Sequence, residues 1–126
     1  MIAIDTSSIV AYLSGEQTAD TEAVDDALGH KAAFIPPIVL TELLSARNLP
    51  RDLRETLLAI PMLDLTDGYW ERAGLLRAHL LSRRYKARLA DTLIAQSCLD
   101  HQVALITRDR DFRHFARYGG LRLVPE

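Results

Sequence analysis

The chain has 126 residues, of which 48% are hydrophobic and 25% are charged, a composition that argues against a disordered or fibrous protein. At this length we expect a single domain, residues 1–126, with one core. The 15 lysines and arginines and 17 aspartates and glutamates give a net charge of −2, which argues against nucleic-acid binding through a broad basic surface. The single cysteine, Cys98, excludes an internal disulfide bond.

The sequence shows no targeting or membrane-spanning segment. Its first twenty residues include three acids and lack the basic stretch and long apolar run of a signal peptide. No uncharged run is longer than ten residues, which is too short to cross a membrane. We therefore expect no membrane association and a cytoplasmic protein.

Short apolar runs alternate with helical segments along the chain. In the first half we expect a strand at 1–5, a helix from the hydroxyl-rich turn 6–8 to Gly15, a helix at 19–28, a strand at 32–35, helices at 38–47 and 51–59, and a strand at 61–65. In the second half we expect helices at 69–84 and 90–100, a strand at 103–107, a helix at 111–118 and a strand at 121–124. The strands are continuous apolar runs, which is typical of parallel strands buried on both faces. The pattern predicts an α/β/α sandwich with a central parallel sheet of four to five strands.

Acidic side chains follow two of the predicted strands. Asp5 ends the first strand, and Asp109 and Asp111 come shortly after the strand at 103–107. Ligands of an open parallel sheet bind beyond the carboxyl ends of its strands. We therefore expect these carboxylates to lie together at one edge of the sheet.

Two further acids, Glu42 and Asp91, lie within predicted helices among apolar neighbours. We expect both carboxylates on buried faces, where an unpaired charge costs several kcal/mol. No basic residue lies within four positions of Glu42 on its apolar side, and the chain contains only two lysines. A divalent cation shared by several acids would offset this cost, and oxygen ligands alone suit Mg²⁺ or Mn²⁺ better than Zn²⁺.

Each acid also has an ordinary structural explanation, and singly these alternatives stay open. The alternatives are a strand-end cap for Asp5, a solvent-exposed helix edge for Glu42, a first-turn helix acid for Asp91, and helix N-caps for Asp109 and Asp111. Five such explanations would have to coincide for the acids to converge on one edge of the sheet. A shared metal site accounts for all five together.

Basic residues are concentrated beside two of these acids. Eight of the 15 cations lie in two short segments, Arg83, Arg84, Lys86 and Arg88 before Asp91, and Arg108, Arg110, Arg113 and Arg117 around Asp109. We expect them to flank the metal pocket and to hold a phosphate backbone, with Tyr85 offering a stacking surface. A solvated helix face is the alternative. The four histidines are scattered, and we expect them on the surface or at helix ends.

Four motifs, taken in order, resemble the PIN-domain nuclease family. The motifs are Asp-Thr-Ser at 5–7, Glu42 after the second strand, Ala-Asp-Thr-Leu-Ile-Ala at 90–95 and Leu-Ile-Thr-Arg-Asp-Arg-Asp-Phe at 105–112. The resemblance covers essentially the whole chain, and the length and motif order are most similar to VapC-type ribonuclease toxins of toxin–antitoxin pairs.

The resemblance implies a set of site residues. Its catalytic acids match Asp5, Glu42, Asp91 and Asp109, its metal ligands match Asp5, Asp91, Asp109 and Asp111, and its supporting hydroxyls match Thr6, Ser7 and Thr107. The implied cofactor is Mg²⁺ or Mn²⁺, and the implied reaction is hydrolysis of RNA phosphodiester bonds. If the five acids share one pocket, the other side chains carry a net charge of +3, which suits an RNA substrate.

The resemblance also implies partners, a homodimer and a cognate VapB-like antitoxin. The helical segment 43–58 and the Tyr12–Leu13 end of the first helix are the expected docking surfaces, although they are equally compatible with ordinary core. A non-catalytic PIN-fold module that binds RNA or protein is the alternative function. An aspartyl-phosphate phosphatase would need a second aspartate at Ser7, and a receiver domain would need a lysine at the end of a late strand. Neither residue is present.

Overall fold

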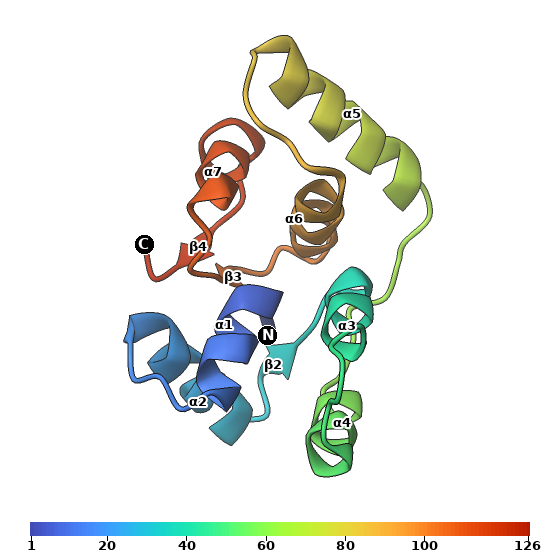
Figure 1. Cartoon of the computed structure of the whole chain (residues 1–126). Helices are drawn as coiled ribbons and strands as arrows, with labels where there is room; N and C mark the ends of the chain where they lie inside the picture. Colours follow the sequence, from blue (N-terminus) through green and yellow to red (C-terminus); the bar gives the residue numbers. More distant parts are fainter.

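The computed structural model describes residues 1–126 and contains one parallel sheet of four strands (Figure 1). The strands are β1 (Ile2–Ile4), β2 (Ala33–Phe34), β3 (Leu105–Ile106) and β4 (Leu123–Val124), in the order β2-β1-β3-β4. The central residue Ala3 pairs with Phe34 on one side and with Leu105 on the other. The predicted parallel α/β architecture is therefore confirmed, with four strands in the sheet.

Helices connect the strands and cover the sheet. They are α1 (Thr6–Leu13), α2 (Ala19–Gly29), α3 (Pro37–Leu44), α4 (Arg51–Leu58), α5 (Tyr69–Ser82), α6 (Leu89–His101), the short 3₁₀ helix η1 (Arg110–Phe112) and α7 (Arg113–Gly119). Helix α5 lies along the outside of α6, and α4 lies beyond α3 at the far end of the molecule (Figure 1). No helix is both long and apolar enough to cross a membrane.

The core is one cluster of 22 buried residues from the sheet and from the inner faces of the helices. Ala3 and Ile4 of β1 and Leu105 and Ile106 of β3 have no solvent exposure, as expected for strands that are covered on both faces. Cys98 is buried in α6 and acts as a small apolar side chain. The polar residues of the site follow the strands where this core ends.

The prediction of a strand at 61–65 is wrong. Only one parallel bridge forms there, between Ile35 and Met62. The Ile35 amide donates to the Pro61 carbonyl, and the Leu63 amide donates to the Ile35 carbonyl, at 2.9 and 3.0 Å. Pro61 has no amide proton to extend the ladder, and the residues after Leu63 are exposed. The pairing therefore stops after a single residue.

Some predicted helix ends also shift. The helix predicted at 38–47 begins at Pro37 and ends at Leu44, where the Ser45 hydroxyl donates to the Thr41 carbonyl at 2.7 Å. The helix predicted at 111–118 is divided into η1 and α7. This division matters for the site, because η1 begins directly after Asp109.

Candidate metal centre

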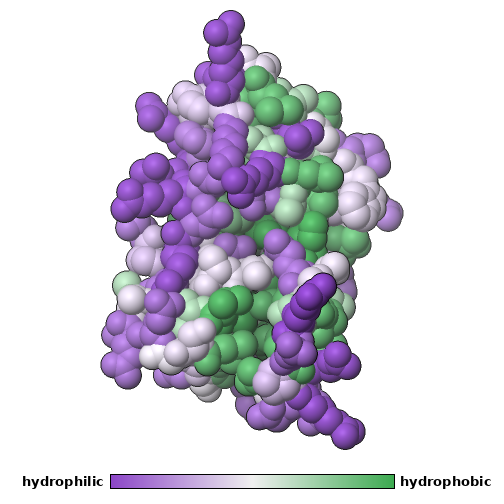
Figure 2. Space-filling view, in the orientation of Figure 1, coloured by the Kyte–Doolittle hydropathy of each residue, from purple (hydrophilic) through white to green (hydrophobic).

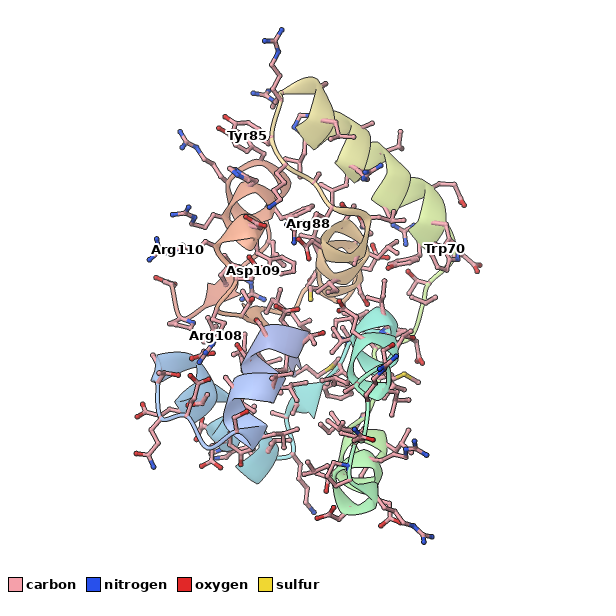
Figure 3. The ribbon with its side chains drawn as sticks, in the orientation of Figure 1. Trp70, Tyr85, Arg88, Arg108, Asp109 and Arg110 are labelled. Carbon is pink, nitrogen blue, oxygen red and sulfur yellow. The ribbon has the colours of Figure 1, made fainter.

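Three carboxylates converge beyond the carboxyl end of the sheet. Asp91 lies in the first turn of α6, Asp109 precedes η1, and Asp111 lies within η1. One oxygen of each lies within 4.8 Å of the oxygens of the other two. Asp109 lies near the middle of the molecule, between α1, α6 and α7 (Figure 3). The topology creates this site, because the ends of β1 and β3 are adjacent and α6 begins beside them.

Asp5 directly follows β1 and is buried, with an exposed fraction of 4%. Its Oδ2 accepts hydrogen bonds from the hydroxyls of Ser7 and Thr107, both at 2.8 Å. Burial raises the pKa of Asp5, and the two hydroxyl donors oppose that rise. The backbone of Thr6 also donates to this carboxylate, and Asp5 is not one of the three acids whose oxygens lie within 4.8 Å of one another.

Thr107 connects the acids that follow the two central strands. Its hydroxyl donates to Asp5 and accepts a hydrogen bond from the backbone amide of Asp109 at 3.0 Å. Oδ1 of Asp109 in turn accepts from the Asp111 amide at 2.9 Å and caps η1. The predicted capping role of Asp109 is therefore confirmed, and the same carboxylate also lies in the acid cluster.

Asp91 is the least compensated of the acids. It is half-buried, and its carboxylate has no hydrogen-bond partner. Burial, and then the negative charges of Asp109, Asp5 and Asp111, raise its pKa to about 6, although Arg88 acts in the opposite direction. A carboxylate in this state is stabilised when a cation binds beside it. Oxygen donors alone, with free lone pairs, fit Mg²⁺ or Mn²⁺.

Glu42 does not lie on a buried face, and that expectation is wrong. The inner residues of α3 are Val39 and Leu43, and Glu42 lies at the exposed edge of this helix. Its Oε1 accepts a hydrogen bond from the Thr6 hydroxyl at 2.8 Å. Its charge contributes to the raised pKa of Asp5, so Glu42 lies near Asp5, but neither Glu42 nor Asp5 is among the three acids that converge within 4.8 Å.

The sequence model of the PIN domain matches residues 2–118. The chain belongs to the PIN-domain family.

Three solved structures share its fold. FitAcB from Neisseria gonorrhoeae is 19% identical with a TM-score of 0.70, and the match covers 98% of this chain and 96% of that chain. VapBC2 from Rickettsia felis, bound to a DNA fragment from their promoter, is 19% identical with a TM-score of 0.73 and coverages of 98% and 97%. VapBC-5 from Mycobacterium tuberculosis is 23% identical with a TM-score of 0.65 and coverages of 98% and 96%. Comparison with curated proteins gave no match.

The basic residues of this PIN domain differ in their surroundings. Nζ of Lys86 lies 3.0 Å from Oδ2 of Asp111, and this contact lowers the pKa of Asp111. Arg88 occupies the N-cap position of α6, without a capping side-chain hydrogen bond, three residues before Asp91. Five other exposed arginines of the two segments form no ion pair, namely Arg83, Arg84, Arg110, Arg113 and Arg117, whereas Arg108 does.

Tyr85 is engaged within the PIN domain. Its ring stacks on His114 and on Tyr118, with centroid distances of 4.7 and 4.5 Å, and its hydroxyl bonds to that of Tyr118. The guanidinium groups of Arg83 and Arg117 each lie 5.5 Å from the centre of the Tyr118 ring. These contacts fasten the basic segment before α6 to α7.

The structure also reveals an ion pair between a buried aspartate and a partly exposed arginine that sequence reasoning missed. Asp20, in the first turn of α2, is 5% exposed and accepts hydrogen bonds from Ser8 and Arg108. Arg108 holds the pKa of Asp20 well below its usual range. Nothing in the spacing could reveal this pair, since its members are 88 positions apart. Arg108, which we predicted to bind RNA, is thus occupied by internal partners.

Proposed function

We propose that this PIN domain is a VapC-like endoribonuclease that hydrolyses RNA phosphodiester bonds with Mg²⁺ or Mn²⁺ held by its clustered carboxylates. The observation that carries the proposal is the convergence of Asp91, Asp109 and Asp111 within 4.8 Å, with no hydrogen-bond donor on Asp91. Such a cluster is costly without a cation and suits one well. A structural explanation for Asp91 alone does not account for this convergence.

Asp91, Asp109 and Asp111 would hold the ion, and Asp5, whose charge acts on Asp91, would support it from the end of β1. The bound ion supplies an activated water and offsets the charge that develops on the phosphoryl oxygens. Ser7 and Thr107 fix the Asp5 carboxylate, while Thr6 orients Glu42 at the solvent side. In this arrangement Glu42 completes the catalytic quartet from the side on which a substrate enters.

The exposed arginines and Lys86 would hold the phosphates of the RNA on either side of the acids. Lys86 and Arg88 lie next to the cluster, and Arg83, Arg84 and Arg110 are exposed farther out. Arg88 and Arg110 lie on either side of Asp109 (Figure 3). Contacts of this kind give affinity that is independent of sequence and sensitive to salt.

We also propose that a cognate antitoxin covers an apolar groove between α1, α3 and α4. Its lining includes Val10, Leu13, Leu43, Leu49, Leu53 and Leu57, with Thr6 and Glu42 at one side. Figure 2 shows the corresponding apolar band over these helices. The groove therefore leads to the acids, so a segment bound in it would also reach the site. The structure of VapBC-5 is of a member of a toxin–antitoxin family, which supports this kind of partner.

A homodimer is the second partner that we propose, on the basis of the family resemblance. Trp70, Leu75 and Leu81 of α5 remain 62%, 72% and 47% exposed in a single chain and would be partly covered by a second copy. Sedimentation analysis tests this directly. A monomer at micromolar concentration would contradict it.

The decisive experiment incubates the purified protein with total cellular RNA in the presence of Mg²⁺, Mn²⁺ or a chelator. We expect cleavage with either metal, none with chelator, and products that carry a 5′-phosphate and a 3′-hydroxyl. Asp91→Asn should abolish cleavage, whereas Asp67→Asn, which changes an exposed acid outside the cluster, should not.

Three outcomes would overturn the proposal, namely cleavage in chelator, 2′,3′-cyclic phosphate ends, and full activity of Asp91→Asn. RNA binding without any cleavage would favour the non-catalytic alternative.

A further inference from the structure

A second polar network connects α1 and α2 to the loop that carries Asp109. The Asp20 side chain is 6% exposed, and its carboxylate accepts from the Ser8 hydroxyl at 2.9 Å and from Nε and Nη2 of Arg108 at 2.8 and 3.1 Å. Nη1 of Arg108 donates to Glu16 at 2.9 Å, and Nη2 also donates to Thr18 at 3.0 Å. All three guanidinium nitrogens are thus bound within the protein.

The position of Arg108 in the chain gives this network its importance. Its two neighbours are Thr107, whose hydroxyl bridges Asp5 and the Asp109 amide, and Asp109 itself, an acid of the cluster. A planar guanidinium that makes two bonds to a buried carboxylate is fixed in position and orientation. The backbone on either side of Arg108 is fixed with it.

The loop around Arg108 is short, and Arg108 is the residue of this loop that connects it to α2 and to the segment just before α2. β3 ends at Ile106, and η1 begins only at Arg110, so three residues connect a buried strand to a short helix. One of these three residues supplies a carboxylate of the cluster. A shift of about 1 Å in such a group is enough to impair a metal or catalytic site.

We infer that the Asp20–Arg108 pair is a positioning device for the metal centre, which holds Thr107 and Asp109 where their oxygen atoms converge with those of Asp5 and Asp91. The inference rests on the proposed function, because it takes the acid cluster to be a cation site. It changes the role of Arg108 from a contact with RNA to a constraint on the loop. Metal affinity should then depend on Asp20, although Asp20 is not a metal ligand.

The molecule contains a matched control for this inference. Arg72 makes the same two-bond contact with Asp100, from Nε at 2.9 Å and Nη2 at 2.7 Å, and a threonine hydroxyl, that of Thr66, also joins it. The exposed fractions of the side chains are 41% and 9%, compared with 34% and 6% for Arg108 and Asp20. The control pair connects the start of α5 to the end of α6, about 13 Å along α6 from Asp91.

The experiment compares Arg108→Met, Arg108→Lys and Asp20→Asn with Arg72→Met and Asp100→Asn. Titration calorimetry gives the Mn²⁺ dissociation constant of each variant, at a temperature at which all of them are folded. The hydrogen-exchange rates of the Asp109 and Asp111 amides, measured by NMR in the metal-free protein, show how well ordered the loop is.

We expect Arg108→Met and Asp20→Asn to raise the dissociation constant at least tenfold and to speed exchange of both amides. Arg108→Lys should lie between them and the wild type, because lysine keeps the charge and loses the second bond. The control variants should lose comparable stability and change the dissociation constant less than twofold.

Equal effects of the two sets on affinity and exchange would overturn the inference and leave Arg108 as an ordinary stabilising residue. If the wild type binds no Mn²⁺, the proposed function fails, but exchange in the metal-free protein still decides whether the pair orders the loop. Unfolding of Arg108→Met leaves Arg108→Lys and Asp20→Asn to decide the matter.

Discussion

The ammonium group of Lys86 lies 3.0 Å from the carboxylate of Asp111, so a positive charge lies beside one of the three clustered acids. Lys86→Met should therefore strengthen Mn²⁺ binding and weaken RNA binding. The lysine repels a cation in the cluster and attracts phosphate. Both partners are partly exposed, so each change should be about two- to fivefold.

Calorimetry with Mn²⁺ and fluorescence anisotropy with labelled RNA in chelator measure the two effects of Lys86→Met. Lys31→Met is the control, because Lys31 is the other lysine and precedes β2, away from the carboxyl ends of the strands. Weaker Mn²⁺ binding by Lys86→Met would show that the lysine supports the cluster instead of competing with a metal.

Asp91→Asn should stabilise the metal-free protein at pH 7. Burial and the neighbouring acids raise the pKa of Asp91 to about 6, so its charge is unfavourable in the folded state, and no hydrogen bond is lost on substitution. We expect a gain of roughly 1 kcal/mol after allowance for solvent screening. This gain should raise the melting temperature by a few degrees.

Saturating Mn²⁺ should raise the melting temperature of the wild type and leave that of Asp91→Asn almost unchanged, since ligand binding stabilises only the variant that binds. Differential scanning calorimetry with and without Mn²⁺ measures both effects. Asp67→Asn should respond as the wild type does. A metal-dependent increase in Asp91→Asn equal to that of the wild type would exclude Asp91 as a ligand.

Arg108→Met should destabilise the fold in a manner that depends on pH. The hydrogen bonds from Arg108 hold the pKa of Asp20 below its ordinary value of 3.8. A lowered folded-state pKa stabilises the protein above the unfolded-state value, and this stabilisation is lost as the pH falls. The variant should therefore lose about 2–3 kcal/mol at pH 7, because Asp20 stays buried without its partner.

The free-energy difference between wild type and Arg108→Met should narrow below pH 4, where the unfolded carboxyl becomes protonated, and should shrink further as Asp20 itself is protonated. Urea unfolding at several pH values between 3 and 7 measures this. A difference that is constant across this range would show that Arg108 stabilises the fold by packing and not through its charge.

The sequence was sufficient to predict the elements that bring the acids together. Residues after a parallel strand lie at its carboxyl end, so the positions of Asp5 and Asp109 followed from their strands alone. Glu42 was misplaced because helical periodicity gives the apolar face of α3 only to within one position, and Val39 and Leu43 define a face that excludes it. The sequence therefore predicts the position of a side chain reliably when it follows a parallel strand. It does so less reliably when the side chain lies at the edge between the buried and exposed faces of a helix.

Pairing between distant segments accounts for the remaining errors. The segment 61–65 could form a strand only by pairing with a neighbouring strand, and a single bridge to Ile35 is the only pairing that forms. Arg108 was assigned to RNA because its charge was visible in the sequence, whereas its partner in α2 was not. Such contacts depend on tertiary packing, which cannot be predicted from the pattern of charges along one segment.

The double substitution Arg83→Ala and Arg84→Ala should reduce the salt dependence of RNA binding. Both side chains are exposed, form no ion pair and follow the end of α5, so phosphates can approach them, although Arg83 also contacts the Tyr118 ring. For single-stranded nucleic acid, each phosphate contact contributes about 0.7 to the slope of log affinity against log salt. Loss of both contacts should therefore lower the slope by about 1.4.

Anisotropy titrations of a labelled single-stranded RNA between 50 and 200 mM salt, in chelator to prevent cleavage, measure this slope. The control is the double substitution Arg51→Ala and Arg54→Ala on α4, where the arginines are also exposed, although Arg51 pairs with Glu55 at 3.4 Å, and α4 lies at the opposite end of the molecule from the end of α5 (Figure 1). The control removes the same number of positive charges, but from a helix that we do not expect to contact the RNA. Salt screens charges at such a distance, so the control should keep the slope of the wild type. Equal slopes for the two double variants would mean that net charge alone governs binding and that the segment before α6 does not contact the RNA.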